Sequence, residues 1–199
     1  MPSKKSPYDA HPGLGMEEAW IARMPEKTGK SLEQWKRLLQ ATGLATEKER
    51  RDWLKKQHQV GTNYAMLIAQ LSIGKNRLTD YEDGAALVEA MFARKEGLRP
   101  IYEQLLRLGK SLGKDVKACP CKTMVPLYRN HVFAQLKPST KTRVDLGLAL
   151  KDEPAGGRLI DTGGRAKGDR ITHRLAVTAP AEVDDELKRW LRKAYEMDA

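Results

Sequence analysis

Apolar residues in the first third of the chain recur three and four positions apart, the spacing of one face of an α-helix. Ser31 and Thr46 each begin a capping-box pattern, S-L-E-Q and T-E-K-E, in which a hydroxyl and a Glu or Gln side chain satisfy the first backbone N–H groups. The apolar positions that share helical faces are Met16, Trp20, Met24, Leu32, Trp35, Leu38, Leu39, Trp53, Leu54, Tyr64, Leu67, Ile68 and Leu71.

This pattern predicts a small all-helical domain over residues 14–74, with its three tryptophans in the core. We expect residues 1–13 to be a loose tail. Residues 75–84 gather turn-forming residues without periodicity, so we expect them to be a linker before a second domain over 85–199.

Two predicted helices that meet at Gly61 raise the alternative of a helix-turn-helix. A DNA-recognition helix presents polar or basic side chains to base edges. The second helix here reads N-Y-A-M-L-I-A-Q-L and contains no Lys or Arg, although Asn63 and Gln70 are polar. Ordinary helix packing is therefore the favoured interpretation.

In the second domain the apolar residues recur with two different spacings. Residues 85–95 and 100–112 show helical stripes, and the last helix starts at Pro180. Between these helices the period changes to two, which indicates half-buried strands. The predicted strands are residues 123–128, 131–137, 142–150, 158–162 and 171–177. The fold class is therefore α+β: a small all-helical N-terminal domain followed by an antiparallel sheet packed by helices.

The alternation also predicts a register for the central hairpin. It places Leu136 opposite Val144, Ala134 opposite Leu146 and Val132 opposite Leu148, so that one face of the sheet is apolar throughout.

The other face then carries the unusual residues. Lys122, Lys137 and Arg143 fall in one row on it, and Tyr128 and Phe133 lie farther along. Like charges opposite one another destabilise a sheet. The row therefore requires solvent, the nearby Asp145 or an anionic ligand.

The net charge of +10 and a pI of about 9.6 favour polyanionic partners, although a basic surface also serves solubility alone. Residues 84–199 contain 22 Lys and Arg against 15 Asp and Glu, so most of the excess belongs to the second domain. There is no transmembrane-length apolar run and no secretory signal pattern at the N-terminus. Cys119 and Cys121 have one proline between them, and neighbours this close rarely form a disulfide, which together with the missing signal points to a reducing cytoplasm.

Several stretches together resemble two bacterial domain families. PEKTGKSLEQW and RRDWLKKQHQVGTNYAMLIA resemble domain of unknown function 4287. LRPIYEQL, PSTKTRVDLGLAL, ITHRL and EVDDELKRWLRKAY resemble domain of unknown function 5655. The resemblance implies a bacterial cytoplasmic protein with a compact α+β second domain. It implies no established activity and no catalytic residues.

Functional motifs are sparse. No nucleophile-elbow, phosphate-loop, dinucleotide-binding or zinc-protease pattern is present. His173 and Asp145 remain as acid–base candidates of the lowest weight, and the Cys119-Pro120-Cys121 spacing is wrong for the common zinc classes. We therefore expect no metal, no cofactor and no enzymatic activity.

The leading hypothesis is a protein that binds nucleic acid, whether RNA, ribosome or DNA, through a basic sheet face and hairpin. The alternative is a domain for protein interaction or for a small anionic ligand. The candidate binding residues are Lys122, Lys137, Lys141, Arg143, Asp145, Arg165, Lys167, Arg170, Tyr128 and Phe133.

Overall fold

The computed structural model describes residues 6–75 and 83–199, which form two compact units. The helical unit comprises residues 11–75, and the sheet unit comprises residues 6–10 together with 83–199. Most of the predicted linker over 75–84 lies outside the described residues. No helix in the described ranges has both the length and the apolar character needed to cross a membrane.

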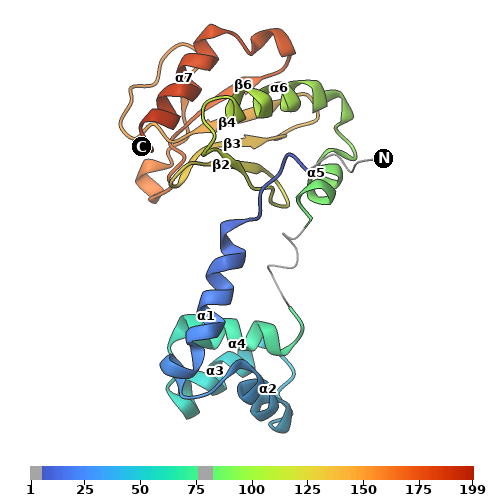
Figure 1. The fold of residues 1–199 in the computed structure, drawn as a ribbon, viewed down its shortest axis with the longest axis vertical. Coiled ribbons are helices and arrows are strands. Elements are labelled where there is room, and N and C mark those ends of the chain that lie inside the picture. Colours follow the sequence, from blue (N-terminus) through green and yellow to red (C-terminus); the bar gives the residue numbers. More distant parts are fainter. Residues whose placement is uncertain (1–5, 76–82) are drawn as a thin grey trace. The chain divides into compact units, whose positions relative to one another are not determined.

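The helical unit contains four helices (Figure 1): α1 (Pro12–Thr28), α2 (Leu32–Ala41), α3 (Glu47–His58) and α4 (Thr62–Ser72). Both predicted capping boxes are confirmed, at Ser31 before α2 and at Thr46 before α3. Among the three tryptophans only Trp35 is fully buried. Trp53 is half-buried against the core, and Trp20 is half-buried outside it. Trp20 stacks at a tilt on Tyr64, with ring centroids 5.5 Å apart.

The sheet unit is a six-stranded antiparallel sheet in the order β1-β2-β3-β4-β6-β5, and the α+β prediction is confirmed. Its strands are β1 (Lys117–Ala118), β2 (Val125–Tyr128), β3 (Val132–Lys137), β4 (Val144–Leu148), β5 (Ile160–Asp161) and β6 (His173–Val177). Its helices are α5 (Gly84–Phe92), α6 (Arg99–Lys110) and α7 (Asp185–Glu196), with short 3₁₀ turns η2 (Glu96–Leu98), η3 (Arg165–Lys167) and η4 (Pro180–Glu182).

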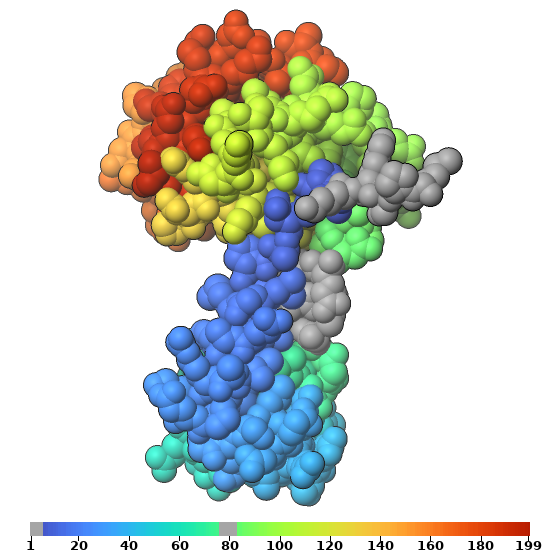
Figure 2. Space-filling model, in the orientation of Figure 1, coloured from blue at the N-terminus to red at the C-terminus, as the bar shows by residue number. Residues whose placement is uncertain are grey.

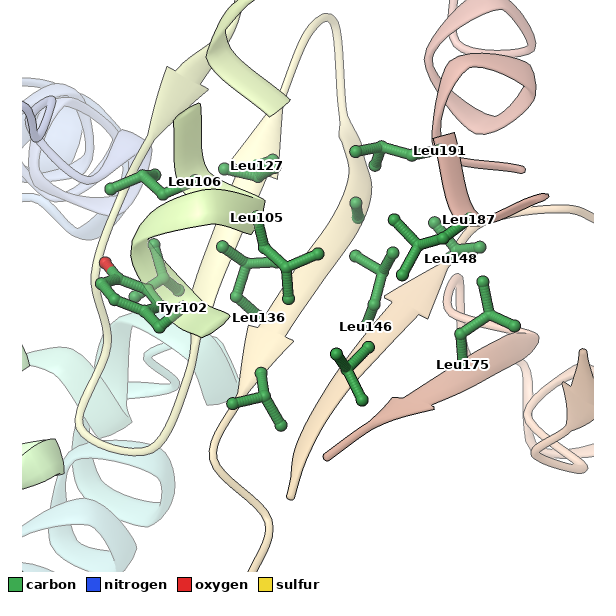
Figure 3. Close-up of a cluster of buried hydrophobic side chains, with 14 of the residues drawn as sticks. Tyr102, Leu105, Leu106, Leu127, Leu136, Leu146, Leu148, Leu175, Leu187 and Leu191 are labelled. Atoms are coloured by element: carbon green, nitrogen blue, oxygen red, sulfur yellow. The ribbon is translucent and has the colours of Figure 1, made fainter. Parts of the chain in front are cut away.

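One face of this sheet is covered by α6 and α7 (Figure 1). Leu105 of α6 and Leu187 of α7 point onto Leu136, Leu146 and Leu148 of the sheet, and all five side chains are fully buried (Figure 3). Side chains of α6 (yellow-green) and α7 (red) adjoin on the outer surface (Figure 2). The functional question therefore concerns the opposite face, which we call the polar face.

The predicted register is wrong by two residues. Leu136 pairs with Leu146 and Ala134 with Leu148, because the connection from β3 to β4 runs through residues 138–143 rather than a tighter turn. The Thr140 N–H donates to the Arg143 carbonyl at 3.4 Å and closes this turn. A slip of two residues leaves Ala134, Leu136, Leu146 and Leu148 on their predicted face, so alternation alone does not distinguish the two registers. Val132 and Phe133 are exceptions near the irregular β2–β3 register: Phe133 belongs to the core, and Val132 lines the polar face.

The N-terminal segment also differs from the expected loose tail. The Asp9 N–H donates to the Ala118 carbonyl at 2.8 Å, and the Ala118 N–H donates back to Asp9 Oδ2 at 2.9 Å. The Tyr102 hydroxyl of α6 lies 3.0 Å from that of Tyr8. Residues 8–10 therefore cover the outer edge of β1, whose exposed backbone groups would otherwise invite strand pairing.

Candidate nucleic-acid interface

Asp145 of β4 lies at the centre of a charged cluster on the polar face. Arg143 Nε lies 2.8 Å from Asp145 Oδ1, and Arg174 of β6 donates to the same oxygen at 3.3 Å. Arg143 Nη2 also donates to Oδ2 at 3.2 Å. Lys137 lies directly opposite Asp145 across the β3–β4 pair, so the predicted facing of Lys137 and Arg143 does not occur. One carboxylate is thereby shared by two arginines and faces a lysine, so the cluster keeps an excess of positive charge.

The hairpin that joins β3 to β4 carries two exposed lysines. Lys137 ends β3 and Lys141 stands in the turn, and the ammonium of neither forms an ion pair with any residue that the structure describes. Thr142 N–H donates to the Thr140 hydroxyl oxygen at 3.2 Å, so these hydroxyl-bearing residues help to shape the turn. The turn therefore presents positive charge that is not compensated internally.

The residue range 162–171, which we call the covering loop, packs onto the polar face. A Cβ on Gly147 of β4 would lie only 2.8 Å from Ile171 Cγ2, so glycine is required for this close approach. The Thr162 N–H donates to the Thr172 carbonyl at 2.9 Å, and the Asp169 N–H donates to the Gly164 carbonyl at 2.9 Å. These bonds give the loop a defined position over β4.

A groove of about 500 Å³ runs between β3 and the covering loop. Gln135 and Lys137 contribute one wall, and Thr162 and Arg170 contribute polar groups on the other. The remaining lining residues are Val132, Asp169 and Ile171. Because the two lining cations come from positions 33 residues apart in the chain, the fold creates a shared cationic groove that neither segment has alone.

The three cations of the covering loop have different surroundings. Arg165 pairs with Asp152, and Arg170 pairs with Asp198 while its Nε donates to the Val132 carbonyl at 2.9 Å. Lys167 is exposed and has no ion pair within the described ranges. The arginines therefore hold the loop in place, whereas the lysine remains available to an anion.

The aromatic part of the predicted interface is wrong for Phe133. Its side chain is fully buried and packs edge-on against Tyr195 of α7, with ring centroids 5.6 Å apart. A base cannot stack on a ring that a helix already covers. Tyr128 is half-buried, and burial raises the pKa of its hydroxyl. Lys122 is exposed in the short turn before β2, outside the groove.

The histidines and cysteines are dispersed in the structure. His131 donates or accepts through Nδ1 at 3.1 Å from Asp198 Oδ1, whereas His173 is buried in the sheet with Nδ1 2.8 Å from the Thr172 hydroxyl. Burial raises the pKa of the Cys119 thiol to about 11, which disfavours its thiolate form. Across residues 6–75 and 83–199, no group of three or more His, Cys, Asp or Glu side chains is arranged to hold a metal ion.

Sequence reasoning missed Asp198, the residue that organises one end of the sheet unit. Its side chain is only 3% exposed, and it binds Arg170 and both the backbone N–H and the ring of His131. Gln135 and Thr162 of the groove were also missed. A lone Asp after a C-terminal helix carries no local pattern, so its role emerges only from the tertiary structure.

Together these features define an α+β protein in which an antiparallel sheet keeps one polar, cationic face, joined to a separate helical unit. The chain belongs to the DUF5655 family, a domain of unknown function whose family model matches residues 88–198. The model of a second domain of unknown function, DUF4287, matches residues 17–73 of the helical unit. The predicted resemblance to both is thereby confirmed. No curated protein and no solved structure matches the chain.

Proposed function

We propose that the sheet unit binds nucleic acid non-enzymatically through its phosphate groups, along the groove between β3 and the covering loop. The observation that carries the proposal is the groove itself, where Lys137 and Arg170 converge with the amide of Gln135 and the hydroxyl of Thr162. Cations, amides and hydroxyls are the groups that proteins use to contact phosphate and sugar.

The length of the groove fits an extended segment of single-stranded nucleic acid rather than a single phosphate. Its β3 wall runs from Val132 to Lys137, which corresponds to about 17 Å of strand. Lys141 of the adjoining hairpin and Lys167 of the covering loop are exposed and lie outside its lining. Because Phe133 is buried and Arg143 is held by Asp145, the proposal rests on phosphate contacts and not on base stacking.

Salt dependence offers the direct test. Three lysines without internal ion pairs, Lys137, Lys141 and Lys167, predict a slope of log K against log salt of about −2 for a single strand, at about 0.7 per phosphate contact. Affinity for a labelled single-stranded oligonucleotide, measured by fluorescence anisotropy, should fall about 20-fold between about 50 and 200 mM salt.

The variant Lys137→Gln should reduce this slope by about 0.7, because one phosphate contact is lost. Lys114→Gln is the matched control, since Lys114 is an exposed lysine in the turn before β1, at the opposite end of β3 from the hairpin. No binding to RNA or DNA at the lowest salt would refute the proposal, as would equal slopes for both variants.

The same assay addresses the alternative, a small anionic ligand in this groove. Binding that inorganic phosphate displaces at low millimolar concentration, with no dependence on oligonucleotide length, would favour that alternative. Affinity that rises with length would favour the nucleic acid. A cytoplasmic location forms part of the proposal, and the two free cysteines of the sheet unit suit a reducing compartment.

A further inference from the structure

A second depression, which we call the C-terminal cavity, lies beside the groove. Its volume is about 460 Å³, within the range of pockets that hold small molecules. Three separated segments line it: the residues that follow β4, the covering loop with Thr172 directly after it, and the residues after α7. The lining residues are Ala149, Lys151, Asp152, Arg165, Gly168, Asp169, Arg170, Thr172, Met197 and Asp198.

Two polar side chains of this cavity, Thr172 and Asp198, are more than nine-tenths buried. The Thr172 hydroxyl oxygen accepts a hydrogen bond from the Leu150 N–H at 3.2 Å and lies 2.8 Å from His173 Nδ1. The other ring nitrogen of His173, Nε2, is buried without a partner in the part of the chain that the structure describes.

This arrangement indicates the tautomer of His173. A buried N–H without an acceptor is more costly than a bare ring nitrogen in apolar surroundings, so the proton belongs on Nδ1 and is donated to Thr172. The Thr172 oxygen then accepts two hydrogen bonds and its own proton remains to be donated. Thr172 therefore offers the cavity a hydroxyl donor in a fixed position.

Most charges at the cavity are paired, but two are not. Arg165 pairs with Asp152, and Arg170 pairs with Asp198. The ammonium of Lys151 and the carboxylate of Asp169 have no hydrogen bond or ion pair among the described residues. The cavity thus presents one positive and one negative group that a ligand can engage.

The backbone at Lys151 adds an independent observation. Lys151 has φ 54°, in the left-handed region that side chains with a Cβ rarely adopt and that Gly and Asn tolerate best. Strained residues of this kind concentrate at functional sites. A lysine at a position where asparagine would fit the backbone better is explained if its ammonium is needed.

We propose that the C-terminal cavity binds a small molecule that carries one anionic group, a phosphate or a carboxylate, together with a hydrogen-bond-donating amine or amide. Lys151 and the Thr172 hydroxyl receive the anion, and Asp169 accepts from the donor group. This site is distinct from the proposed strand-binding groove, although Asp169 and Arg170 of the covering loop border both.

Thermal-shift and calorimetric titrations of the full chain test the proposal with three probes. Inorganic phosphate supplies the anion alone and should bind weakly. Nucleoside monophosphates and α-amino acids each combine an anion with a donor group, so the arm that saturates identifies the source as phosphate or carboxylate. Failure of every probe to bind at millimolar concentration would overturn the proposal.

Variants then locate the site. Lys151→Asn should weaken binding of the active probe at least about tenfold while the free protein melts no lower, because asparagine tolerates the left-handed backbone. Asp169→Asn should weaken it too, and Lys114→Asn should not. Unchanged affinity in both cavity variants would overturn the proposal. The strand-binding test depends on Lys137 instead, so the two proposals fail separately.

Discussion

Substitution of Asp198 by Asn should destabilise the sheet unit strongly. The Asp198 carboxylate is almost fully buried and accepts from the His131 N–H at 2.8 Å, from the His131 ring and from Arg170. These contacts tie the end of the chain to the β2–β3 turn and to the covering loop. Asparagine keeps the shape of the side chain but removes the charge and directs an N–H₂ group at one of the donors.

The size of the destabilisation follows from the hydrogen-bond donors that lose their acceptor. A hydrogen bond to a charged group contributes about 1.5–3 kcal/mol, so three such bonds set an upper limit that is not reached. The side chains of His131 and Arg170 are 66% and 45% exposed and regain water, whereas the backbone N–H of His131 does not regain it fully. We therefore expect a loss of about 2–4 kcal/mol in the free energy of unfolding of the sheet unit.

Urea unfolding can be monitored by hydrogen exchange with mass spectrometry, because peptides of α7 and β3 report the unfolding of the sheet unit separately from that of the helical unit. The matched control is Asp152→Asn. Asp152 also pairs with an arginine of the covering loop, but its side chain is 65% exposed, so its loss should cost less than about 1 kcal/mol.

The pH dependence gives a second measurement on the same residue. Burial alone would raise the pKa of Asp198, but the hydrogen bonds from His131 and the charge of Arg170 hold that pKa below its ordinary value. The stabilisation is therefore complete above the unfolded-state pKa of about 3.9 and is lost as the pH falls through the folded value. The difference between wild type and Asp198→Asn should close below about pH 4. Equal costs for the Asp198 and Asp152 variants at neutral pH would refute the reasoning.

Two further substitutions probe the polar face. Gly147→Ala places a Cβ 2.8 Å from Ile171 Cγ2, so the covering loop must shift. We expect the free energy of unfolding, measured in urea, to fall by about 1–3 kcal/mol, and an unchanged value would mean that the loop is not packed there. Asp145→Asn leaves Arg143 and Arg174, both half-buried, without a counterion and should lower the free energy of unfolding by about 1–3 kcal/mol. The same change should raise the affinity for single-stranded oligonucleotides in anisotropy titrations, and reduced affinity would contradict the proposed interface.

The sequence predicts the faces of the sheet better than the pairs within it. Hydrophobic alternation assigns Leu136, Leu146 and Leu148 to the core, and all three are fully buried there. The register of the two strands depends on the geometry of the turn between them. The connection over residues 138–143 closes through a hydrogen bond from the Thr140 N–H to the Arg143 carbonyl, which no residue pattern predicts. A two-residue slip changes no buried side chain, so the core cannot reveal the error.

The candidate site shows a different limit. Alternation assigns Phe133 to the polar face, but its side chain is buried against Tyr195 of α7 in the core on the other face. Gln135 and Thr162 line the groove, and Asp198 lines the C-terminal cavity, because distant segments meet there, and no spacing in the chain predicts these positions. Capping boxes are local, by contrast, and both were predicted correctly from four residues each.

The distribution of ion pairs separates the candidate cations by type. Arg143, Arg165 and Arg170 each pair with an aspartate, whereas Lys137 and Lys141 do not pair with any described residue. The planar guanidinium binds a carboxylate through two N–H groups and is less strongly hydrated than an ammonium, so arginine is the better residue for fixed internal pairs.

A count of basic residues therefore overstates the charge available to a partner. In the sheet unit the candidate arginines hold the covering loop and the start of β4 in place, and the unpaired lysines supply the positive surface. It follows that arginine substitutions should act first on stability and only indirectly on binding, while substitutions of Lys137, Lys141 and Lys167 should act on binding with stability unchanged. That division is what a phosphate-binding surface built on a rigid scaffold requires.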